Sequence, residues 1–463
     1  MTPPAPAPAP APGPAPAPAP ATEVTVTTLA QQTEPNKTYN VAATVPGTVV
    51  LTLPSALTAG DTVTINGQSA NDWLVAQNAG QSVVTTNLAG NVAPGALWTA
   101  SSLVPKVWHW ISSDATGQVL LAGEAAGGFL NTSTDGGATW TTGDSTGAIW
   151  ISSDMTPTAS RMVAVAFAGG MYSSTDRGVT WTQMTSTSLG VDLNAQSFES
   201  VTISNDGQRI AAVIQGGGVI FTTDGGTTWA IGAGAPTASG WRSIDSSADG
   251  SVLVAVTQDN TDIYLSTNSG ATWTASPVAV GSPAAPVFDT WYRSKISADG
   301  NTIVVAGNQF GGSSGSGVYV SRDRGVTWTQ GLAAVGDYSA IAMSTDGQTI
   351  GVTQSNANVG GAAGRVLLST DAGATFTPTT ITGAADTDWR AIAMSADGNK
   401  LAVAAGRFLG PVTGQLYTSL GNRTSSGVLG SITGLQNSSV QLQYLGDGRF
   451  SIIQSSGGPF SIR

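Results

Sequence analysis

The chain has 463 residues, no cysteine and a formal net charge of −11, from 17 lysine and arginine residues against 28 aspartate and glutamate residues. The lack of cysteine excludes disulfides, thiol nucleophiles and thiolate metal sites. An acidic chain without a basic run is also a poor partner for nucleic acid or an anionic membrane surface.

The first 22 residues, MTPPAPAPAPAPGPAPAPAPAT, are a proline-alanine tract. Repeated proline prevents a helix and favours a disordered or polyproline II chain, which acts as a semi-rigid spacer. The tract lacks the charged and apolar regions of a secretory signal peptide, and no later run is long and apolar enough to span a bilayer. We expect residues 1–22 to be a stalk or linker.

Strand-like alternation fills residues 23–95 and returns in residues 425–463. The first segment contains TVVLTLPS, DTVTINGQ and DWLVAQNAGQSVV, and the second contains SVQLQYLGDGRFSIIQSSG. Because each set of strands is marginal alone, we expect the two segments to form one small β domain. Residues Gly60–Val84 and Ser438–Ser456 resemble a small β domain of bacteriophage, large-virus and cyanobacterial surface proteins.

Between these segments one octet recurs, as STDGGATW (Ser133–Trp140), STDRGVTW (Ser174–Trp181), TTDGGTTW (Thr222–Trp229), STNSGATW (Ser266–Trp273), SRDRGVTW (Ser321–Trp328) and STDAGATF (Ser369–Phe376). Serine and aspartate side chains bond nearby backbone N–H groups, glycine supplies a positive φ, and tryptophan anchors the next strand. The octets resemble the Asp-box, also called the bacterial neuraminidase repeat. Because such hairpin tips satisfy their own side chains, we expect structural roles for Asp135, Asp176, Asp224, Asn268, Asp323 and Asp371.

A second element precedes the octets and predicts the blades. It reads ISNDGQ, SSADGS, ISADGN, MSTDGQ and MSADGN, with looser copies at Ile111–Gly117 and Ile151–Pro157. Short β-branched runs flank each turn, which predicts a hairpin. A third strand leads into the octet and a fourth follows it. Four antiparallel strands in each of seven repeats predict a seven-bladed β-propeller.

The last repeat lacks its octet after Gln415–Ser419, whereas ALWTAS (Ala96–Ser101) copies ATWTAS (Ala271–Ser276) with a single change. We therefore expect the strand around Trp98 to complete blade seven, which removes the exposed edge of an open ring. The predicted fold is all-β: a seven-bladed propeller over residues 96–424, inserted into a small β domain made of residues 23–95 and 425–463.

Catalytic patterns are sparse in this sequence. His109 is the single histidine, so a Ser-His-Asp triad or a multi-histidine metal site fails, and we expect it to be structural. The glutamates are too scattered to suggest a paired acid and nucleophile; they are Glu23, Glu34, Glu124 and Glu199. Asp386 and Asp388 suggest either a calcium ligand pair or a polar loop that opens an inner strand. We expect no enzyme, no cofactor and no metal site.

Propeller families with known activities match only in part. Sialidases share Asp-boxes but have six blades and an Arg-Ile-Pro motif, which this sequence lacks. Xyloglucanases clamp their substrate between two propellers, and this chain has one. The seven-bladed photosystem II assembly factor is similar in blade pattern, but that family is associated with a basic patch and a targeting sequence.

The two faces of the predicted ring differ in sequence. One face carries the uniform Asp-Gly hairpins and octets, and the other carries diverse second-to-third loops, which is where binding surfaces usually lie. On the diverse face we predict a ligand site in blades four, five and seven, formed by Gln258, Asp259, Gln309, Phe310, Arg407 and Phe408. Aromatic rings, amides and one cation suit a sugar with an acidic substituent. The alternative is that these are ordinary solvated loops.

Six blades also carry an aromatic residue near the start of the inner strand: Trp108, Phe198, Trp241, Trp291, Tyr338 and Trp389. These rings either pack between blades or border the channel and stack on sugars.

We expect a non-enzymatic propeller of an extracellular or virion surface that binds a glycan or a protein receptor, with no nucleic acid and no membrane insertion. One alternative is a structural or decoration protein of a virus particle or fibre that assembles through residues 1–95 and 425–463. The other is a glycoside hydrolase of unfamiliar type.

Overall fold

The computed structural model describes residues 22–79, 81–84, 95, 98–125, 127–145, 147–186, 188–189, 192–259, 262–277, 291–307, 317–333, 337–355, 364–381, 388–406, 413–419, 431–446, 448–457 and 460–462. They form two compact units: one contains the described residues before Val84 and after Gly430, and the other contains those in between. The fold class predicted from the sequence is confirmed, because the chain has seven four-stranded blades inserted between two segments of a small β unit. Within these residues no helix is long and apolar enough to cross a membrane.

The first four blades follow one another along the chain, each from its inner strand outward. Blade one is β9 (Trp108–Ser113), β10 (Leu120–Glu124), β11 (Leu130–Ser133) and β12 (Thr141–Thr142); blade two is β13 (Trp150–Met155), β14 (Met162–Ala166), β15 (Gly170–Ser174) and β16 (Thr182–Gln183); blade three is β17 (Phe198–Ile203), β18 (Ile210–Ile214), β19 (Val219–Thr222) and β20 (Ala230–Ile231); blade four is β21 (Trp241–Ser246), β22 (Leu253–Thr257), β23 (Asp262–Ser266) and β24 (Thr274–Pro277). A 3-10 turn, η1 (Leu193–Ala195), precedes blade three.

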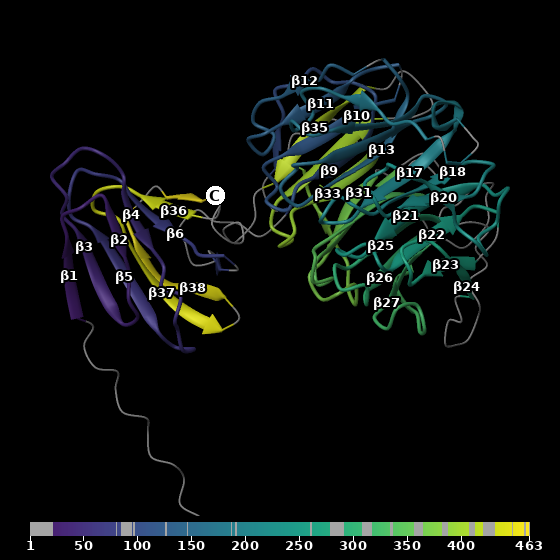
Figure 1. The fold of residues 1–463 in the computed structure, drawn as a ribbon. Helices are drawn as coiled ribbons and strands as arrows, with labels where there is room; N and C mark the ends of the chain where they lie inside the picture. Colours follow the sequence, from purple (N-terminus) through teal and green to yellow (C-terminus); the bar gives the residue numbers. More distant parts are fainter. Residues whose placement is uncertain are drawn as a thin grey trace, which may run out of the picture. The chain divides into compact units, whose positions relative to one another are not determined.

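The last three blades complete the ring. Blade five is β25 (Trp291–Ile296), β26 (Ile303–Gly307), β27 (Val318–Ser321) and β28 (Thr329–Leu332); blade six is β29 (Asp337–Met343), β30 (Ile350–Ser355), β31 (Arg365–Ser369) and β32 (Thr377–Thr379); blade seven is β33 (Trp389–Met394), β34 (Leu401–Gly406), β35 (Thr413–Ser419) and β8 (Trp98–Ala100). The outer strand of blade seven therefore comes from the N-terminal side of the propeller, with Trp98 opposite Ser419. In Figure 1, the inner strand of blade seven, β33, lies beside β9 of blade one.

The octets are closed by their own side chains. Ser133 Oγ donates to Asp135 Oδ1 and accepts from Gly137 N, each at 2.8 Å. Asp135 accepts from Thr139 N at 2.8 Å, and Trp140 Nε1 donates to Gly137 O at 3.0 Å. The serine or threonine and aspartate bonds recur in the other five octets, with Asn268 in place of aspartate in blade four.

Backbone bonds join the hairpin tips of neighbouring blades around the ring. Ala115 N donates to Pro157 O at 3.0 Å, and the same type of bond links residues 205 to 248, 248 to 298, 298 to 345, 345 to 396 and 396 to 115, at 2.8–2.9 Å. The bond from Ala396 to Ala115 joins blade seven to blade one. Pro157 has no N–H to donate, which accounts for the one junction without this bond, between blades two and three.

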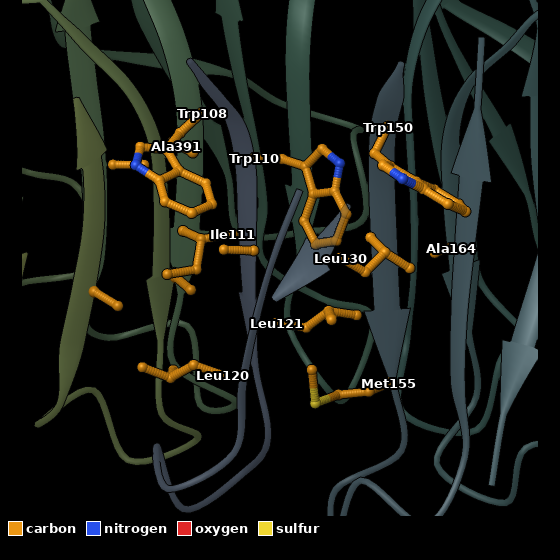
Figure 2. Close-up of a cluster of buried hydrophobic side chains, with 14 of the residues drawn as sticks. Trp108, Trp110, Ile111, Leu120, Leu121, Leu130, Trp150, Met155, Ala164 and Ala391 are labelled. Atoms are coloured by element: carbon orange, nitrogen blue, oxygen red, sulfur yellow. The ribbon is translucent and has the colours of Figure 1, made fainter. Parts of the chain in front are cut away.

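Apolar side chains fill the space between blades. One cluster, drawn in Figure 2, joins blades seven, one and two, with the indoles of Trp108, Trp110 and Trp150 toward one end of the strands and Leu120 and Met155 toward the other. Because side chains of a strand point alternately to its two faces, the apolar residues of each strand pack against the next blade. The core is thus a ring of inter-blade clusters around a channel.

The small β unit has two sheets. The chain alternates between them, so that β1 (Thr22–Val26), β3 (Lys37–Val41) and β5 (Thr62–Gly67) pair in parallel in one sheet, and β2 (Ala30–Gln32), β4 (Val49–Thr52) and β6 (Trp73–Ala76) pair in parallel in the other. The later strands are β7 (Ser82–Val84), β36 (Ser431–Gly434), β37 (Ser439–Gly446), β38 (Arg449–Ser456) and β39 (Ser461–Ile462). Of these, β37 pairs antiparallel with β5, and β36 pairs antiparallel with β6. The C-terminal strands therefore extend both sheets on the side of β5 and β6. Figure 1 shows the purple and yellow strands in this one body.

Candidate functional site

The inner strands of the seven blades surround a central cavity of about 190 Å³. Its walls come from β9, β13, β17, β21, β25, β29 and β33. Drug-sized ligands usually occupy pockets of about 300–1,000 Å³. This channel is therefore large enough for one small group of a ligand.

Every inner strand contains one extra residue relative to its hairpin partner. In blade four, for example, Trp241 pairs with Thr257 and Ser243 with Val256, so Arg242 is a β-bulge. The equivalent bulge residues are His109, Ile151, Glu199, Tyr292, Ser339 and Arg390. A bulge turns a side chain away from the regular alternation of the strand. Six of the seven bulge residues line the cavity, and in blade five the next residue, Arg293, does so in place of Tyr292.

The bulges lie at the channel end that faces the second-to-third loops. Trp291 pairs with Gly307 and Trp389 with Ala405, and these partners are the last residues of β26 and the last but one of β34. The loops that follow these strands therefore begin beside the bulges. We call the bulge residues together with Arg293 the bulge ring.

The aromatic residues before the bulges are packing residues. Trp108, Phe198, Trp241, Trp291, Tyr338 and Trp389 are all buried, and Trp150 holds the same position in blade two. In four blades the tryptophan contacts a tyrosine of the third strand edge-on, with ring centroids 5.1–5.7 Å apart. Of the two interpretations of these rings, the structure supports packing.

Two arginines of the bulge ring are held in place by neighbouring blades. Arg242 Nη1 lies 3.3 Å from Glu199 Oε1, and its Nε donates to Gln258 Oε1 at 2.8 Å. Arg293 Nε donates to Ser339 O at 2.8 Å, and its guanidinium lies 4.1 Å from the ring centroid of Tyr292. Stacking and hydrogen bonds hold the planar guanidinium groups in place beside the channel.

The bulge ring carries net positive charge within an acidic chain. Arg242, Arg293 and Arg390 contribute three positive charges and Glu199 one negative charge, so the ring has a net charge of +2. Burial raises the pKa of Glu199, and the charges of Arg242 and Arg293 oppose that shift. Burial, together with the charges of Arg390 and Arg293, lowers the pKa of His109 to about 3.

His109 is therefore neutral and has a defined tautomer. Its Nδ1 lies 3.1 Å from Trp150 O. A carbonyl oxygen can only accept, so Nδ1 carries the proton and Nε2 is left as an acceptor. This histidine contributes no positive charge to the ring.

A second charged layer lies deeper in the channel. Lys295 Nζ donates to Asp245 Oδ1 at 2.9 Å; 38% of the lysine side chain is exposed, to the interior of the channel, against 8% of the aspartate side chain. Asp245 also accepts from Ile296 N, and Asp154 accepts from Ile203 N, each at 2.9 Å. Burial lowers the pKa of Lys295, but the charges of Asp245 and Asp154 outweigh it and the net direction is upward. Both aspartates thus tie neighbouring inner strands together.

Two residues of the sequence-predicted site are described. Gln258 accepts from Arg242 of the bulge ring. Asp259 accepts from Gly240 N and, at 2.8 Å, from Ser239 Oγ, and these bonds lower its pKa. Gln309, Phe310, Arg407 and Phe408 lie outside the described residues. Sequence reasoning missed Arg242, Arg293, Arg390 and Glu199, although the pairs Trp241-Arg242 and Trp389-Arg390 repeat the same step at the same point of a blade.

Metal ligation has little support in the described parts of the chain. They contain no group of three or more histidine, aspartate or glutamate side chains that could hold an ion. Asp386 lies outside the described residues, and Asp388 uses its backbone carbonyl to accept from Gly406 N at 3.0 Å.

Comparisons with known proteins support the fold only. No family model matches this chain, and no curated protein is similar to it in sequence. Among solved structures it is similar to YCF48 bound to D1 peptide, with 15% identity and a TM-score of 0.50 over 70% of this chain and 96% of that one. It is also similar to the GH74 enzyme of Niastella koreensis (16% identity, TM-score 0.51, 77% of this chain and 55% of that one) and to U3-55K (6%, 0.52, 71% and 100%). This chain is a seven-bladed β-propeller. Its neighbours include enzymes and non-enzymes, so the fold does not set the activity.

Proposed function

We propose that this propeller is a non-enzymatic binding protein of an extracellular or virion surface, and that it takes a glycan or a protein receptor at the channel mouth on the loop face. The observation that carries the proposal is the bulge ring. Seven inner strands each turn one side chain out of the sheet pattern at the same level, and polar or charged groups occupy five of these positions. Side chains re-aimed by bulges beside a cavity are typical of functional sites.

The strands that lead into two of the sequence-predicted loops end beside the bulges. Gln309, Phe310, Arg407 and Phe408 follow Gly307 and Gly406, which end β26 and β34 beside the bulges. We propose that these four residues, with Gln258, border the mouth, and that Asp259 shapes the loop through its bonds to residues 239 and 240. The structural neighbour YCF48, which was solved bound to D1 peptide, adds support for a protein partner.

The charged groups of the channel favour binding over hydrolysis. A glycosidase needs two carboxyl groups free to act on one bond. Here Glu199 is paired with Arg242, and Asp154 and Asp245 accept from the backbone of neighbouring blades. We therefore propose that the ligand is held without turnover.

The proposal is tested by applying the full chain to a glycan array and to host-surface extracts, and by assaying the bound glycans for released sugar. We expect a defined set of bound ligands with no release. Release of sugar would favour the hydrolase, and a lack of any glycan or receptor ligand would reject the binding function.

A structural role is the second candidate, and the small β unit favours it. The strands β1 and β2 form the edges of its two sheets, at the end of the stack opposite the C-terminal strands. Sheet edges can pair with another chain. A native mass measurement that shows an oligomer of the full chain, reduced to a monomer by removal of residues 1–95 and 425–463, would support assembly through these segments.

We also propose that the octets are Asp-boxes and that the small unit is related to the phage, large-virus and cyanobacterial domain. The corresponding side-chain bonds that recur in all six octets support the first proposal. For the second, the motif after Trp73 forms a buried polar turn, in which Gln81 Nε2 donates to Pro54 O at 2.6 Å and Asn78 Nδ2 donates to Leu53 O at 2.7 Å.

A further inference from the structure

The small β unit has two sheet edges that can be compared. β1 ends one sheet and β2 ends the other, and among the described residues no strand pairs with the outer side of either (Figure 1). The last carbonyl of β1, Val26 O, accepts from Ala42 N, directly after β3, and Leu29 O, just before β2, accepts from Val50 N of β4. Successive residues of a strand direct their backbone groups to opposite sides. Every second residue, counted from these two, therefore faces inward, and the residues between them face outward.

The edge of β2 is closed by its own side chains. Its outward residues are Ala30 and Gln32. Ala30 O accepts from Thr28 Oγ1 at 2.9 Å, and Gln32 O accepts from Gln31 Nε2 at 2.7 Å. Because side chains of the same segment occupy both outward carbonyls, they compete with the backbone of any incoming strand.

The edge of β1 is open. Its outward residues are Glu23 and Thr25, and within the described residues neither backbone has a partner on the outer side. Both side chains are exposed, whereas Val24 and Val26 pack against the core of the unit. β1 therefore offers two N–H donors and two C=O acceptors to a further strand.

A row of polar side chains crosses the outer face of this sheet and ends at Glu23. Asn66 Nδ2 of β5 donates to Asn40 Oδ1 of β3 at 2.9 Å, and Asn40 Nδ2 donates to Glu23 Oε2 at 3.3 Å. An ionised carboxylate can accept at about four positions, so Glu23 keeps acceptor capacity on the side away from β3. A strand added to β1 extends the row when it places a hydroxyl or amide donor opposite Glu23.

The sequence of β1, TEVTV, supplies that donor itself. When two copies pair antiparallel about Val24, Glu23 of each copy lies opposite Thr25 of the other, and every outward N–H meets an outward C=O. The Thr25 hydroxyl then donates to Glu23, and the two Val24 side chains meet on the core face. Pairing centred on Glu23 would set two carboxylates opposite each other, which is destabilising. Pairing centred on Thr25 would leave Glu23 opposite a residue beyond the end of the strand.

We propose that the outer edge of β1 binds β1 of a second copy, so that two chains pair antiparallel about Val24 into one continuous sheet. The inference goes beyond ligand binding and rests on the second candidate function, to which it assigns one edge and one register. A five-residue strand buries little surface, so the dimer is expected to be weak and concentration-dependent. The proline-alanine tract before β1 is a poor occupant of the same edge, because it favours polyproline II, which forms no strand ladder.

The experiment is sedimentation equilibrium of the full chain over a wide range of concentration, for the wild type and two variants of Thr25. In the proposed register each dimer contains two pairs of residue 25 with Glu23. Thr25→Lys therefore sets opposite charges across both pairs, and Thr25→Glu sets like charges. The dimer is expected to become about two- to thirtyfold tighter with lysine and weaker by a similar factor with glutamate.

Thr64→Lys and Thr64→Glu are the matched controls. Thr64 lies in β5, two strands from the edge, and its variants change the net charge by the same amounts. They should leave the dissociation constant of the dimer unchanged. The double variant Glu23→Lys, Thr25→Glu again sets opposite charges across the junction and should dimerise more tightly than Thr25→Glu alone.

Monomers at every concentration for both wild type and Thr25→Lys would overturn the proposal, and so would equal effects of lysine and glutamate at residue 25. An oligomer that is unchanged in the Thr25 variants but lost on removal of residues 1–95 and 425–463 would also overturn the β1 pair, while it would support assembly through these segments. Binding on the glycan array should be the same for all of these variants. A monomeric chain that still binds its array ligand therefore leaves the binding function standing.

Discussion

Glu199 Oε1 lies 3.3 Å from Arg242 Nη1, across the junction between blades three and four. Both residues are β-bulge residues, each at the start of the inner strand of its blade. Their side chains are only 11% and 18% exposed. The pair therefore links two blades at the channel mouth and sets how much positive charge the mouth presents.

The first prediction concerns this pair. A buried charge left without its partner is costly, whereas removal of both charges is much less so. We expect Glu199→Ala and Arg242→Ala each to lower the free energy of unfolding. The double variant should lower it by less than the sum of the two single effects. The coupling free energy should be about 0.5–3 kcal/mol. Urea unfolding of the four proteins measures it, and strict additivity would contradict a working ion pair.

The second prediction concerns the octets. Asp135→Ala removes the acceptor for Thr139 N and Ser133 Oγ and should lower the free energy of unfolding by about 0.5–2 kcal/mol, the usual range for lost cap bonds. Asp135→Asn is the matched control, because Asn268 makes the corresponding bonds in blade four. Asp135→Asn should lower the free energy of unfolding by less than Asp135→Ala does. The alanine and asparagine variants of Asp224 and of Asp371 should rank in the same way. Binding should be unchanged in all of these variants, and its loss in a folded variant would give the octets a functional role.

The third prediction is a pH dependence. Hydrogen bonds from the side chain and backbone of Thr180 lower the pKa of Asp176 to about 2, below the ordinary value of about 3.9. A lowered pKa means that this carboxylate stabilises the fold fully above about pH 4, and that the contribution is lost as the pH falls toward 2. The difference in unfolding free energy between wild type and Asp176→Asn should therefore shrink over that interval. A difference that stays constant with pH would contradict it.

Sequence predicted the ring because its signals are local. Each octet and each Asp-Gly hairpin carries its own turn chemistry, and their recurrence fixes the number of blades. Blade two is an instructive exception. Its hairpin reads DMTPTAS, without Asp-Gly, so the spacing to the turn that identifies the other six inner-strand aromatics does not identify Trp150.

The channel mouth could not be predicted in the same way. A bulge is a shift in pairing between two strands, and neither strand alone shows it. The predicted residue Gln258 proved to be close to the site because the loop after β22 begins beside the bulge of its own blade.

The fourth prediction compares two glycines in blade three. Gly216 has φ +69° and no atom within 4 Å of an added Cβ, whereas Gly234 has φ +82° and an added Cβ would lie 2.5 Å from Trp273 O. Gly216→Ala therefore has only the backbone cost of a left-handed conformation, about 1–2 kcal/mol. Gly234→Ala adds a clash with backbone of blade four and should cost clearly more. Equal urea unfolding midpoints for the two variants would contradict this, because they would show that the junction between blades three and four accommodates the added methyl group.

The fifth prediction concerns closure of the ring by β8. Trp98 Nε1 donates to Gly95 O at 2.8 Å and to Thr379 Oγ1 at 3.1 Å, and the backbone of Trp98–Ala100 pairs with Tyr417–Ser419. The side chain is only partly buried. Trp98→Ala should therefore cost less than the 3–5 kcal/mol typical of a fully buried tryptophan, about 1–3 kcal/mol. Trp98→Phe keeps a ring and loses only the two N–H bonds, so it should lie between wild type and the alanine variant.

Hydrogen exchange distinguishes loss of closure from general destabilisation. If β8 holds the ring shut, Trp98→Ala should raise exchange first at the amides of β35, which pair with β8, and only later at β14 of blade two. A variant of similar cost elsewhere, such as Gly216→Ala, should not single out β35. An equal rise in exchange at all blades of the Trp98 variant would mean that the propeller opens as one unit. In that case the pairing of β8 with β35 would be no weaker than the contacts within the other blades.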